Sequence, residues 1–517
     1  MAALPFPPLI TGRTYGTTLE QQTAELETDA MIQRFAASRE QLSSDPYRPL
    51  YHYVNPEGNL NDPNGLCYWQ GQYHLFYQAY PPEDTRQHWG HAVSADLVHW
   101  RDLPLAIFPG IENMCFSGST IVEDDRVIAL YHGTQAGNIV AVSHDPLLLN
   151  WEKIPGNPVI PSMKCDAMGR PYRVYDPCIW KEADGYYSLS GTYWDGKIFE
   201  DCRMVQQLFF SQDLTRWTYL GSFVEGDVFT QPGEDGAVPY FWPIGDKHIL
   251  LFASHQRGSQ YLVGDYDTIR HRFHPVSHGR FNFGAISPGG VHAPSATRDG
   301  AGGVYVIHNI NEGRPTQGWN HLMSVVRHLT LRPDGTLGIE PVAGLVALRG
   351  NQVHLGQTAL PANQEIVLDG VRGSALELDL KIDTLSARSV TIDVLRSPDR
   401  AEYTSITWYR NSGFDLNRKG RSIRQSILTL DTTRSSLHAD VYGRAPENAP
   451  LEIENGEQLD LRVFVDRSVV EVFANGRQCV ALRVYPERDD SLGVSVRAQG
   501  GAAALLSVDA WQMKGIY

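Results

Sequence analysis

Long apolar runs and excess positive charge are both missing from this sequence. No stretch approaches the roughly 20 consecutive apolar residues that a membrane-spanning helix needs. Forty-four Lys and Arg stand against 59 Asp and Glu, so the formal net charge is −15. This acidic balance argues against nucleic acid or an anionic membrane as the main partner. It fits a neutral small molecule that is handled by carboxylates.

Cysteine is scarce, and an N-terminal targeting signal is not visible. The six cysteines lie far apart, with no CxxC or Cys/His ligand spacing, so we expect small buried thiols in a reducing compartment and no metal site. The opening MAALPFPPLITGR lacks a basic region followed by a long apolar core. We therefore expect a cytoplasmic protein, although a secreted protein that had lost its leader would look the same.

The first part of the chain predicts one helix. Helix-favouring Glu, Gln, Ala and Leu run from Thr18 to Gln41, with Thr17 or Thr18 as the N-cap. Asp45-Pro46 then ends the pattern. We interpret this helix as a packing arm or an oligomer contact, which makes a homo-oligomer possible.

Beyond about Tyr51 the helical pattern disappears and a repeat begins. Short aromatic or β-branched runs recur five times up to about Leu331, in units of roughly 40 to 50 residues, which is typical of a β-propeller. A second segment recurs between them, as Ser94-Ala-Asp-Leu-Val-His-Trp100, Ser143-His-Asp-Pro-Leu-Leu-Leu-Asn-Trp151, Ser211-Gln-Asp-Leu-Thr-Arg-Trp217 and, more distantly, Asp265-Tyr-Asp-Thr-Ile-Arg-His-Arg-Phe273. We expect five blades, with the recurring Trp residues packing them.

After about residue 345 the repeat stops and strands alternate without helices, which indicates a β-sandwich. The predicted fold is therefore all-β, a five-bladed β-propeller followed by a C-terminal β-sandwich. We divide the chain into an N-terminal extension with one helix (1–46), the propeller (47–342), a linker (343–364) and the sandwich (365–517).

Three carboxylates stand just before equivalent strand pairs of the proposed propeller. Asp62 lies in Asn61-Asp-Pro-Asn-Gly65, Asp176 precedes Pro177, and Glu234-Asp235-Gly236 opens a third, looser copy. Each segment alone is typical of a turn. If the blades surround one axis, however, the three acids converge, and this recurrence favours a functional site.

Converging carboxyls suit the cleavage of a glycosidic bond. One can attack or stabilise the anomeric carbon while another protonates the leaving oxygen, and a third can shape the charge around the transition state. A sugar site also needs rings and hydrogen-bonding side chains. Strand-end segments of the same blades supply Gln78, Trp89, His91, Ser117, Ser119, Tyr193 and Trp194.

Several segments together make the chain resemble a known family. These are Tyr51-His-Tyr-Val-Asn-Pro-Glu-Gly-Asn-Leu-Asn-Asp-Pro-Asn-Gly65, His74-Leu-Phe-Tyr-Gln78, Trp89-Gly-His-Ala-Val-Ser94, Phe116-Ser-Gly-Ser119 and Phe464-Val-Asp-Arg-Ser-Val-Val-Glu-Val-Phe-Ala-Asn-Gly476. From about Tyr51 to the C-terminus the chain is similar to glycoside hydrolase family 32, the invertase, fructanase and fructosyltransferase family. The resemblance implies a five-bladed propeller with a β-sandwich, and retaining hydrolysis of β-fructofuranosides through a covalent fructosyl-enzyme.

The resemblance also implies roles for individual residues. Asp62 would be the nucleophile, Asp176 the transition-state stabiliser and Glu234 the general acid/base. Contacts to the substrate would come from Asn61, Gln78, Trp89, Ser117, Tyr175 and Asp235.

Three departures from the family pattern bear on the site. Tyr175 replaces the usual Arg before the stabilising Asp, with Arg173 two residues away. Glu234-Asp-Gly-Ala-Val-Pro239 replaces Glu-Cys-Pro-Asp, which leaves Asp235 as a rival acid. The segment between Gln78 and Trp89 is short and lacks a Trp that is often found there.

We therefore predict a β-fructofuranosidase that acts on sucrose or short fructo-oligosaccharides, with a small sugar as its partner and no metal or organic cofactor. Fructosyl transfer through the same intermediate is the first alternative. A sugar-binding propeller without catalysis is the second, and activity on arabinosides or xylosides is less favoured by the quoted segments.

Overall fold

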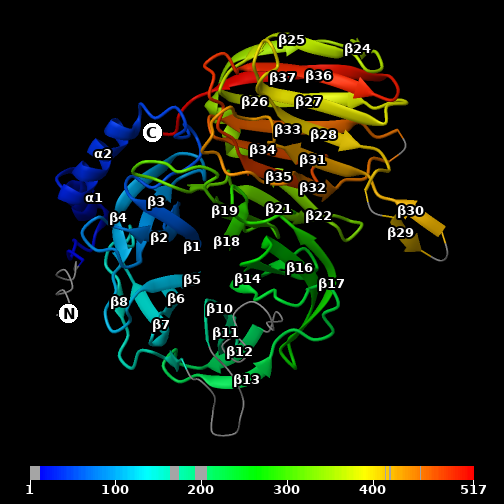
Figure 1. Cartoon of the computed structure of the whole chain (residues 1–517). Coiled ribbons are helices and arrows are strands. Elements are labelled where there is room, and N and C mark those ends of the chain that lie inside the picture. Colours follow the sequence, from blue (N-terminus) through cyan, green and yellow to red (C-terminus); the bar gives the residue numbers. More distant parts are fainter. Residues whose placement is uncertain (1–11, 163–173, 192–205, 414, 419–420, 455) are drawn as a thin grey trace, which may run out of the picture.

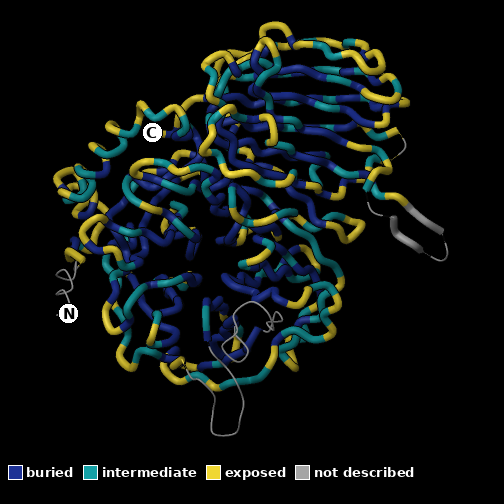
Figure 2. Tube along the Cα trace, in the orientation of Figure 1, coloured by how far each residue is buried: buried dark blue, intermediate teal, exposed yellow. Residues whose placement is uncertain are grey.

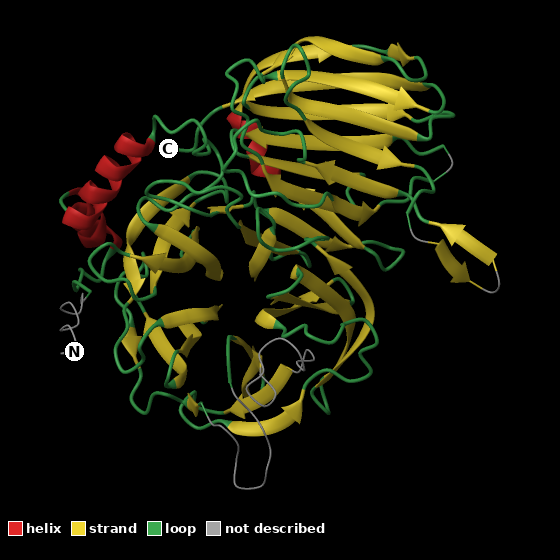
Figure 3. Cartoon of the chain, in the orientation of Figure 1, coloured by secondary structure: helices red, strands yellow, loops and turns green. Residues whose placement is uncertain are grey.

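The computed structural model describes residues 12–162, 174–191, 206–413, 415–418, 421–454 and 456–517. Five small antiparallel sheets surround one axis, and two larger stacked sheets lie against one side of this ring (Figure 1). In the described part of the chain, helices lie at one edge of the ring and in a short turn beside the stacked sheets (Figure 3). This arrangement confirms the predicted five-bladed β-propeller followed by a β-sandwich.

Each blade is one sheet whose strands follow one another in chain order, from the axis outward. The first blade holds β1 (Asn59–Trp69), β2 (Gln72–Tyr80), β3 (His88–Ser94) and β4 (Trp100–Ile107). The second holds β5 (Cys115–Val122), β6 (Val127–Gly133), β7 (Gly137–Ser143), β8 (Glu152–Lys153) and β9 (Ile160–Pro161), and the third holds β10 (Pro177–Glu182), β11 (Gly185–Gly191), β12 (Gln206–Ser211) and β13 (Thr218–Ser222). The fourth holds β14 (Ala237–Ile244), β15 (Lys247–Ser254), β16 (Gly258–Asp267) and β17 (Arg272–Arg280), and the fifth holds β18 (Val291–Arg298), β19 (Val304–Ile310), β20 (Leu322–Met323), β21 (Arg327–Leu331) and β22 (Leu337–Pro341).

The innermost strands β1, β5, β10, β14 and β18 contact one another around the axis, and β18 closes the ring against β1. They are buried along most of their length, whereas exposed segments lie on the outer rim (Figure 2). Second strands such as β6 and β11 are buried at every position. Burial at every position follows from packing between blades on both faces.

The recurring Ser-x-Asp segment is the turn between the third and fourth strands of a blade. Asp96 Oδ1 accepts the backbone N–H groups of Val98 (2.9 Å) and His99 (2.8 Å). The same bonds to residues two and three positions on recur at Asp213 and at Asp267. The repeat is therefore a side-chain-capped turn, and Trp100, Trp151 and Trp217 pack in the cores of the blades, as predicted.

The N-terminal arm contains two helices where the sequence predicted one. Thr18 forms a capping box with Gln21 at the start of α1 (Leu19–Glu27). Asp29 then caps α2 (Ala30–Leu42) by accepting the N–H groups of Met31 and Ile32, so a second helix starts after a two-residue break at Thr28 and Asp29. Among the described helices, none combines the length and the apolar character needed to cross a bilayer.

The sandwich begins earlier than predicted. After the 3-10 turn η1 (Ala343–Leu348), β23 and β24 lie within the expected linker, but both pair with β37. One sheet consists of β23 (Arg349–Leu355), β24 (Thr358–Leu360), β26 (Ala375–Asp383), β33 (Leu459–Asp466), β34 (Val469–Ala474), β35 (Gln478–Arg483) and β37 (Ala503–Met513). The other consists of β25 (Glu365–Arg372), β27 (Ser389–Arg396), β28 (Thr404–Tyr409), β31 (Ile427–Asp431), β32 (Glu447–Pro450) and β36 (Gly493–Gln499), while β29 (Asp415–Arg418) and β30 (Arg421–Arg424) form a separate hairpin.

A buried charge cluster joins the sandwich to the propeller. Asp466, at the end of β33, accepts the backbone N–H groups of Leu50, Tyr51 and His52 at 2.8–2.9 Å. The His52 ring lies between Asp466 Oδ2 (2.9 Å) and Glu471 Oε1 (3.1 Å). Burial alone would lower the pKa of His52, but these hydrogen bonds and charges raise it to about 9. The segment before β1 is thereby fixed to the sandwich.

Candidate active site

All five innermost strands start at the same end of the channel, and most of them start irregularly. The ladder between the first two strands of a blade is interrupted between Leu60 and Pro63, Cys115 and Gly118, Ala237 and Tyr240, and Val291 and Pro294. Such bulges redirect side chains that a regular strand would point into the neighbouring blades. Asn61, Asp62, Ser117 and His292 all lie within them.

Asp62 is buried, with one carboxylate oxygen fixed by two neighbours. Its Oδ2 accepts the Ser117 hydroxyl at 2.7 Å and Gln78 Nε2 at 3.3 Å. Gln78 Nε2 also lies 2.6 Å from Ser117 Oγ. Asp62 Oδ1 has no hydrogen-bond partner in the described part of the chain. The carboxylate is thus held in position through one oxygen, while its other oxygen is buried and accepts no hydrogen bond from the described residues.

Asp176 is the second buried carboxyl of this end. Its Oδ2 accepts the backbone N–H of Val238 at 3.2 Å, and its Oδ1 has no partner among the described residues. Burial, and next the charge of Asp62, raise the pKa of Asp176 to about 8, although His255 opposes the change. The two carboxyls therefore sense each other's charge, and near neutral pH the pair retains a proton.

Glu234 is fully buried before β14, and its partners among the described residues lie in the fourth blade or in the loop that leads into it. Oε2 accepts the backbone N–H of Gln231 at 2.7 Å. Oε1 accepts Gln260 Nε2 at 2.7 Å and Arg280 Nη2 at 3.4 Å, and Arg257 Nη1 lies 3.5 Å away. Gln260 is in β16 and Arg280 in β17, so this carboxylate contacts the outer strands of its blade.

Asp235, the next residue, has a different set of neighbours. Its two oxygens accept the backbone N–H of His255 at 3.1 Å and the ring Nδ1 of His255 at 2.5 Å. Burial would lower the pKa of His255, but this bond and the charges of Asp235, Asp176 and Asp62 raise it to about 9. The Asp235–His255 pair therefore belongs electrostatically to the two central carboxyls.

The remaining predicted contacts fall into two groups. Asn61 is near the site, where its Oδ1 accepts Asn309 Nδ2 at 3.2 Å, and the Tyr175 ring packs 4.8 Å from that of His132.

Trp89 lies behind the site, because it is fully buried and its indole N–H donates to the Phe116 carbonyl at 2.9 Å. His91 and Ser119 are also buried, bound to His74 and to the backbone of Ile179. Arg173, Tyr193 and Trp194 lie outside the described residues.

Sequence reasoning missed His255 and His292 at this site. His292 Nδ1 lies 3.5 Å from Asp62 Oδ1, and the His255 and His292 rings are 5.7 Å apart. Burial lowers the pKa of His292 to about 4 despite the nearby Asp62, so it is neutral at physiological pH. Its place at the start of β18 matches that of Asn61 in β1, and aligning the fifth unit of the repeat with the first could have found it.

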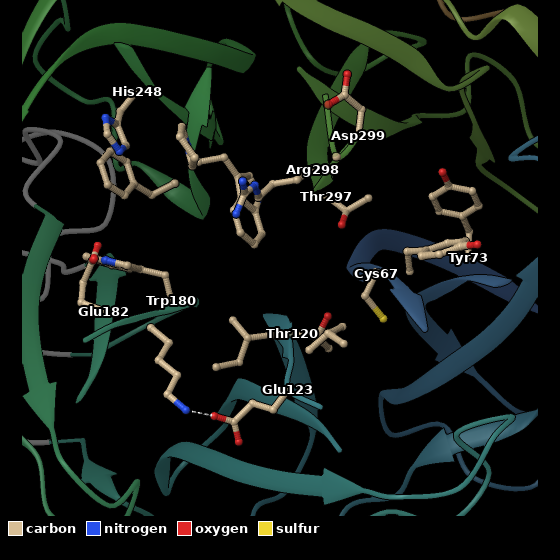
Figure 4. Close-up of a pocket in the computed structure, with 18 residues that line it drawn as sticks. Cys67, Tyr73, Thr120, Glu123, Trp180, Glu182, His248, Thr297, Arg298 and Asp299 are labelled. Atoms are coloured by element: carbon tan, nitrogen blue, oxygen red, sulfur yellow. Dashed lines mark hydrogen bonds and ion pairs between the residues drawn. The ribbon is translucent and has the colours of Figure 1, made fainter. Parts of the chain in front are cut away.

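The opposite end of the channel has a different character. A cavity of about 860 Å³ lies where the innermost strands end (Figure 4). Its wall includes Trp180, Trp242 and Tyr68, and the Lys181 ammonium is paired there with Glu123. None of the predicted site residues that the structure describes lines this cavity, so the candidate chemistry belongs to the end where the strands begin.

Comparison with known proteins agrees with this geometry. The chain is 28% identical to the levanase of Bacillus subtilis (strain 168) over 513 residues, covering 92% of this chain and 71% of that protein. It is 29% identical to the sucrose-6-phosphate hydrolase of Klebsiella pneumoniae over 492 residues, covering 88% and 92%. The crystal structure of fructan 1-exohydrolase IIa from Cichorium intybus matches with a TM-score of 0.77 at 23% identity, covering 91% and 98%.

Two family models account for almost the whole chain beyond the N-terminal arm. The N-terminal domain of glycosyl hydrolases family 32 matches residues 52–341, and the C-terminal domain of the same family matches residues 344–512. These ranges correspond to the propeller and the sandwich. The chain therefore belongs to glycosyl hydrolase family 32 and is a glycosidase.

Proposed function

We propose that this glycosidase is a retaining β-fructofuranosidase that releases terminal β-D-fructofuranosyl units from sucrose or short fructo-oligosaccharides. The observation that carries the proposal is the environment of Asp62, whose Oδ2 is fixed by Ser117 and Gln78 while its Oδ1 accepts no hydrogen bond from the described residues. The names of the relatives, which specify levan, fructan and sucrose 6-phosphate, support a fructosyl substrate.

In the first step, Asp62 Oδ1 would attack the anomeric carbon C2 of the fructosyl unit. The bond from C2 to the glycosidic oxygen breaks, a proton is transferred to that oxygen, and a fructosyl ester of Asp62 forms. In the second step, water attacks C2 and returns a proton to the protein, which regenerates Asp62. Two displacements at one carbon retain its configuration.

Asp176 would stabilise the positive charge that develops on the sugar ring. In the free protein its carboxyl holds a proton near neutral pH, for the reasons given above. When Asp62 becomes an ester it loses its charge, and the ionised form of Asp176 becomes easier to reach. The acid/base group would come from the loop before β14, where the sequence predicted Glu234 and left Asp235 as its rival.

The test is a product assay with sucrose, raffinose, inulin and levan as substrates. We expect free fructose from sucrose and from short oligosaccharides, and loss of this activity in Asp62→Asn. Longer oligosaccharides at high sucrose concentration would identify transfer as the main reaction. Binding of sucrose without release of any product would contradict the proposal and leave a sugar-binding propeller.

A further inference from the structure

The cavity at the end of the channel opposite the candidate active site is lined by all five blades. Figure 4 shows side chains from each blade around one hollow, in blade order Tyr73, Thr120, Glu182, His248 and Thr297. Its volume of about 860 Å³ lies in the range of pockets that bind small molecules, about 300–1,000 Å³. The hollow is therefore large enough to hold a small ligand.

A buried hydrogen-bond network separates this cavity from the active site. The Tyr240 hydroxyl accepts the backbone N–H of Gly65 at 2.9 Å and donates to the Gly118 carbonyl at 3.0 Å. Ser295 Oγ lies 2.9 Å from the same hydroxyl and accepts the N–H of Leu66 at 2.9 Å. These residues belong to β14, β1, β5 and β18, midway between the two ends of the innermost strands. A ligand in the cavity would thus occupy a separate site.

Aromatic rings on the first and fourth blades form two parts of the cavity wall. Tyr68, at the end of β1, is 50% exposed, and its ring packs 4.7 Å from that of Tyr73. The Tyr73 ring in turn packs edge-on against Tyr305 at 6.0 Å. On β14, the Trp242 indole N–H donates to the Ala296 carbonyl at 3.2 Å. Rings held in this way lose little conformational freedom when a ligand packs on them.

Polar side chains without partners lie beside these rings. Thr297 and Arg298 end β18, which packs between β1 and β14, and Glu182 ends β10 on the other side of β14. None of these three side chains makes a hydrogen bond or an ion pair with a described residue. A guanidinium offers a planar set of N–H donors and a carboxylate offers two acceptor oxygens, which suit neighbouring hydroxyl groups.

The charges at the wall nearly balance. Two of its three carboxylates are paired with basic side chains, as Glu123 with Lys181 and Asp299 with His328. Arg298 and Glu182 then remain as one charge of each sign. Burial lowers the pKa of His248, so this ring adds no positive charge near neutral pH. The cavity lacks the excess of cations that recognition of a phosphate requires, and its chemistry favours a neutral, hydroxyl-rich ligand.

We propose that this cavity is a second, non-catalytic binding site for a neutral sugar. Tyr68 and Trp242 pack on the C–H faces of the sugar rings, while Arg298 and Glu182 bind hydroxyl groups. The chain belongs to a glycosidase family, so oligosaccharides are present wherever it acts. The site holds one such molecule while another is processed at the opposite end, and it is independent of the reaction proposed above.

The test follows Trp242 directly by fluorine NMR. The full chain with Asp62→Asn is labelled with 5-fluorotryptophan and titrated with the trisaccharide raffinose, whose integrity is checked by chromatography. The Trp242 signal, assigned by its loss in Trp242→Phe, should shift and saturate. Tyr68→Ala and Arg298→Ala should each raise the Kd read from this signal about two- to tenfold. The matched control Tyr409→Ala, at a tyrosine of the sandwich that is 37% exposed, should leave it unchanged.

Three results would overturn the assignment. The first is a Trp242 signal that does not move up to the solubility limit of raffinose. The second is the same Kd in Tyr68→Ala and Arg298→Ala as in their parent, because the shift would then come from the active site. The third is a shift with inorganic phosphate in place of raffinose.

Thermal unfolding identifies a variant that fails to fold, and Tyr68→Ser then replaces Tyr68→Ala. Failure of the proposed function is a separate outcome, because a wild type that releases no fructose would leave the Trp242 titration as it stands.

Discussion

The molecule buries two clusters of carboxyl and imidazole groups, one at the propeller–sandwich junction and one at the mouth of the channel. At the junction, all four oxygens of Asp466 and Glu471 accept hydrogen bonds, from three backbone N–H groups before β1, the N–H of Val325, both nitrogens of His52, and Arg327. At the channel mouth, Asp62 and Asp176 each keep one oxygen without a described partner.

The difference shows how to separate a structural cluster from a functional one. A buried carboxylate whose oxygens all accept hydrogen bonds stabilises one arrangement of the chain. A buried carboxylate with one oxygen that accepts no hydrogen bond costs stability, and a bound ligand can restore it. At the junction, Asp466 is paired with His52. At the channel mouth, burial and next the charge of Asp62 raise the pKa of Asp176. Changes in the first cluster should therefore affect stability, and changes in the second should affect activity.

The largest expected effect is that of Asp62→Asn on activity. Without the proposed nucleophile, kcat/KM for the proposed substrate sucrose should fall by about 10⁴-fold or more, while the unfolding temperature changes little because the amide fits the same space. Fructose release and thermal unfolding, measured on the same preparation, check this. A variant that keeps a tenth of the activity would exclude Asp62 as the nucleophile.

Next in size is the loss of stability in Asp466→Asn. Removal of one partner from a buried charge cluster costs about 3–5 kcal/mol, so chemical denaturation should show a drop of this order in the free energy of unfolding. The control is Asp440→Asn, which breaks an ion pair with Arg314 at 3.0 Å where Asp440 is 51% exposed. That change should cost less than about 1 kcal/mol, and equal costs for the two variants would contradict the comparison.

The pH dependence of stability provides a third test. His52 has a pKa of about 9 in the folded protein, above its ordinary value of 6.5. Its contribution is complete below pH 6.5 and is lost as the pH rises through 9, so the free energy of unfolding should fall over this interval by about 3 kcal/mol. His255 acts with the same sign. The difference between wild type and His52→Gln isolates His52, and parallel pH curves for the two would contradict its role.

The smallest expected effect has the opposite sign. In the unfolded chain Asp176 ionises near pH 3.8, but in the folded protein its pKa is about 8, so the wild type loses stability between these values as the pH rises. Asp176→Asn removes this penalty and should raise the free energy of unfolding at pH 7, with no gain at pH 3.5. Denaturation curves at both pH values check this, and a variant less stable than wild type at pH 7 would show that Asp176 is structural.

The repeat and the family motifs predicted the architecture because both have a local physical basis. The Asp-capped turn recurs between the third and fourth strands of the first, third and fourth blades, and the aromatic runs mark strands that are buried on both faces. The break between the two N-terminal helices was missed because Asp29 is also compatible with an exposed position inside a helix. Only the structure shows that its side chain accepts the N–H groups of Met31 and Ile32.

The site was predictable only in part. Asp62 and Asp176 precede prolines at matching positions of their blades, so sequence could place them together. The orientations of Glu234 and Asp235 depend on Arg280 and His255, which lie 46 and 20 residues further on. No local sequence pattern determines which neighbours the Glu234 and Asp235 side chains contact. The bulge that positions His292 becomes visible only in the strand register.

The most direct test of the double-displacement account is to trap the intermediate. The wild type is mixed with an aryl β-fructofuranoside, quenched in acid and digested, and the masses of the peptides are measured by mass spectrometry. We predict a mass increase of one fructosyl unit on the peptide that carries Asp62, and none in Asp62→Asn. A fructosyl adduct on any other residue, or an unmodified chain together with fructose released in the inverted configuration, would contradict the account.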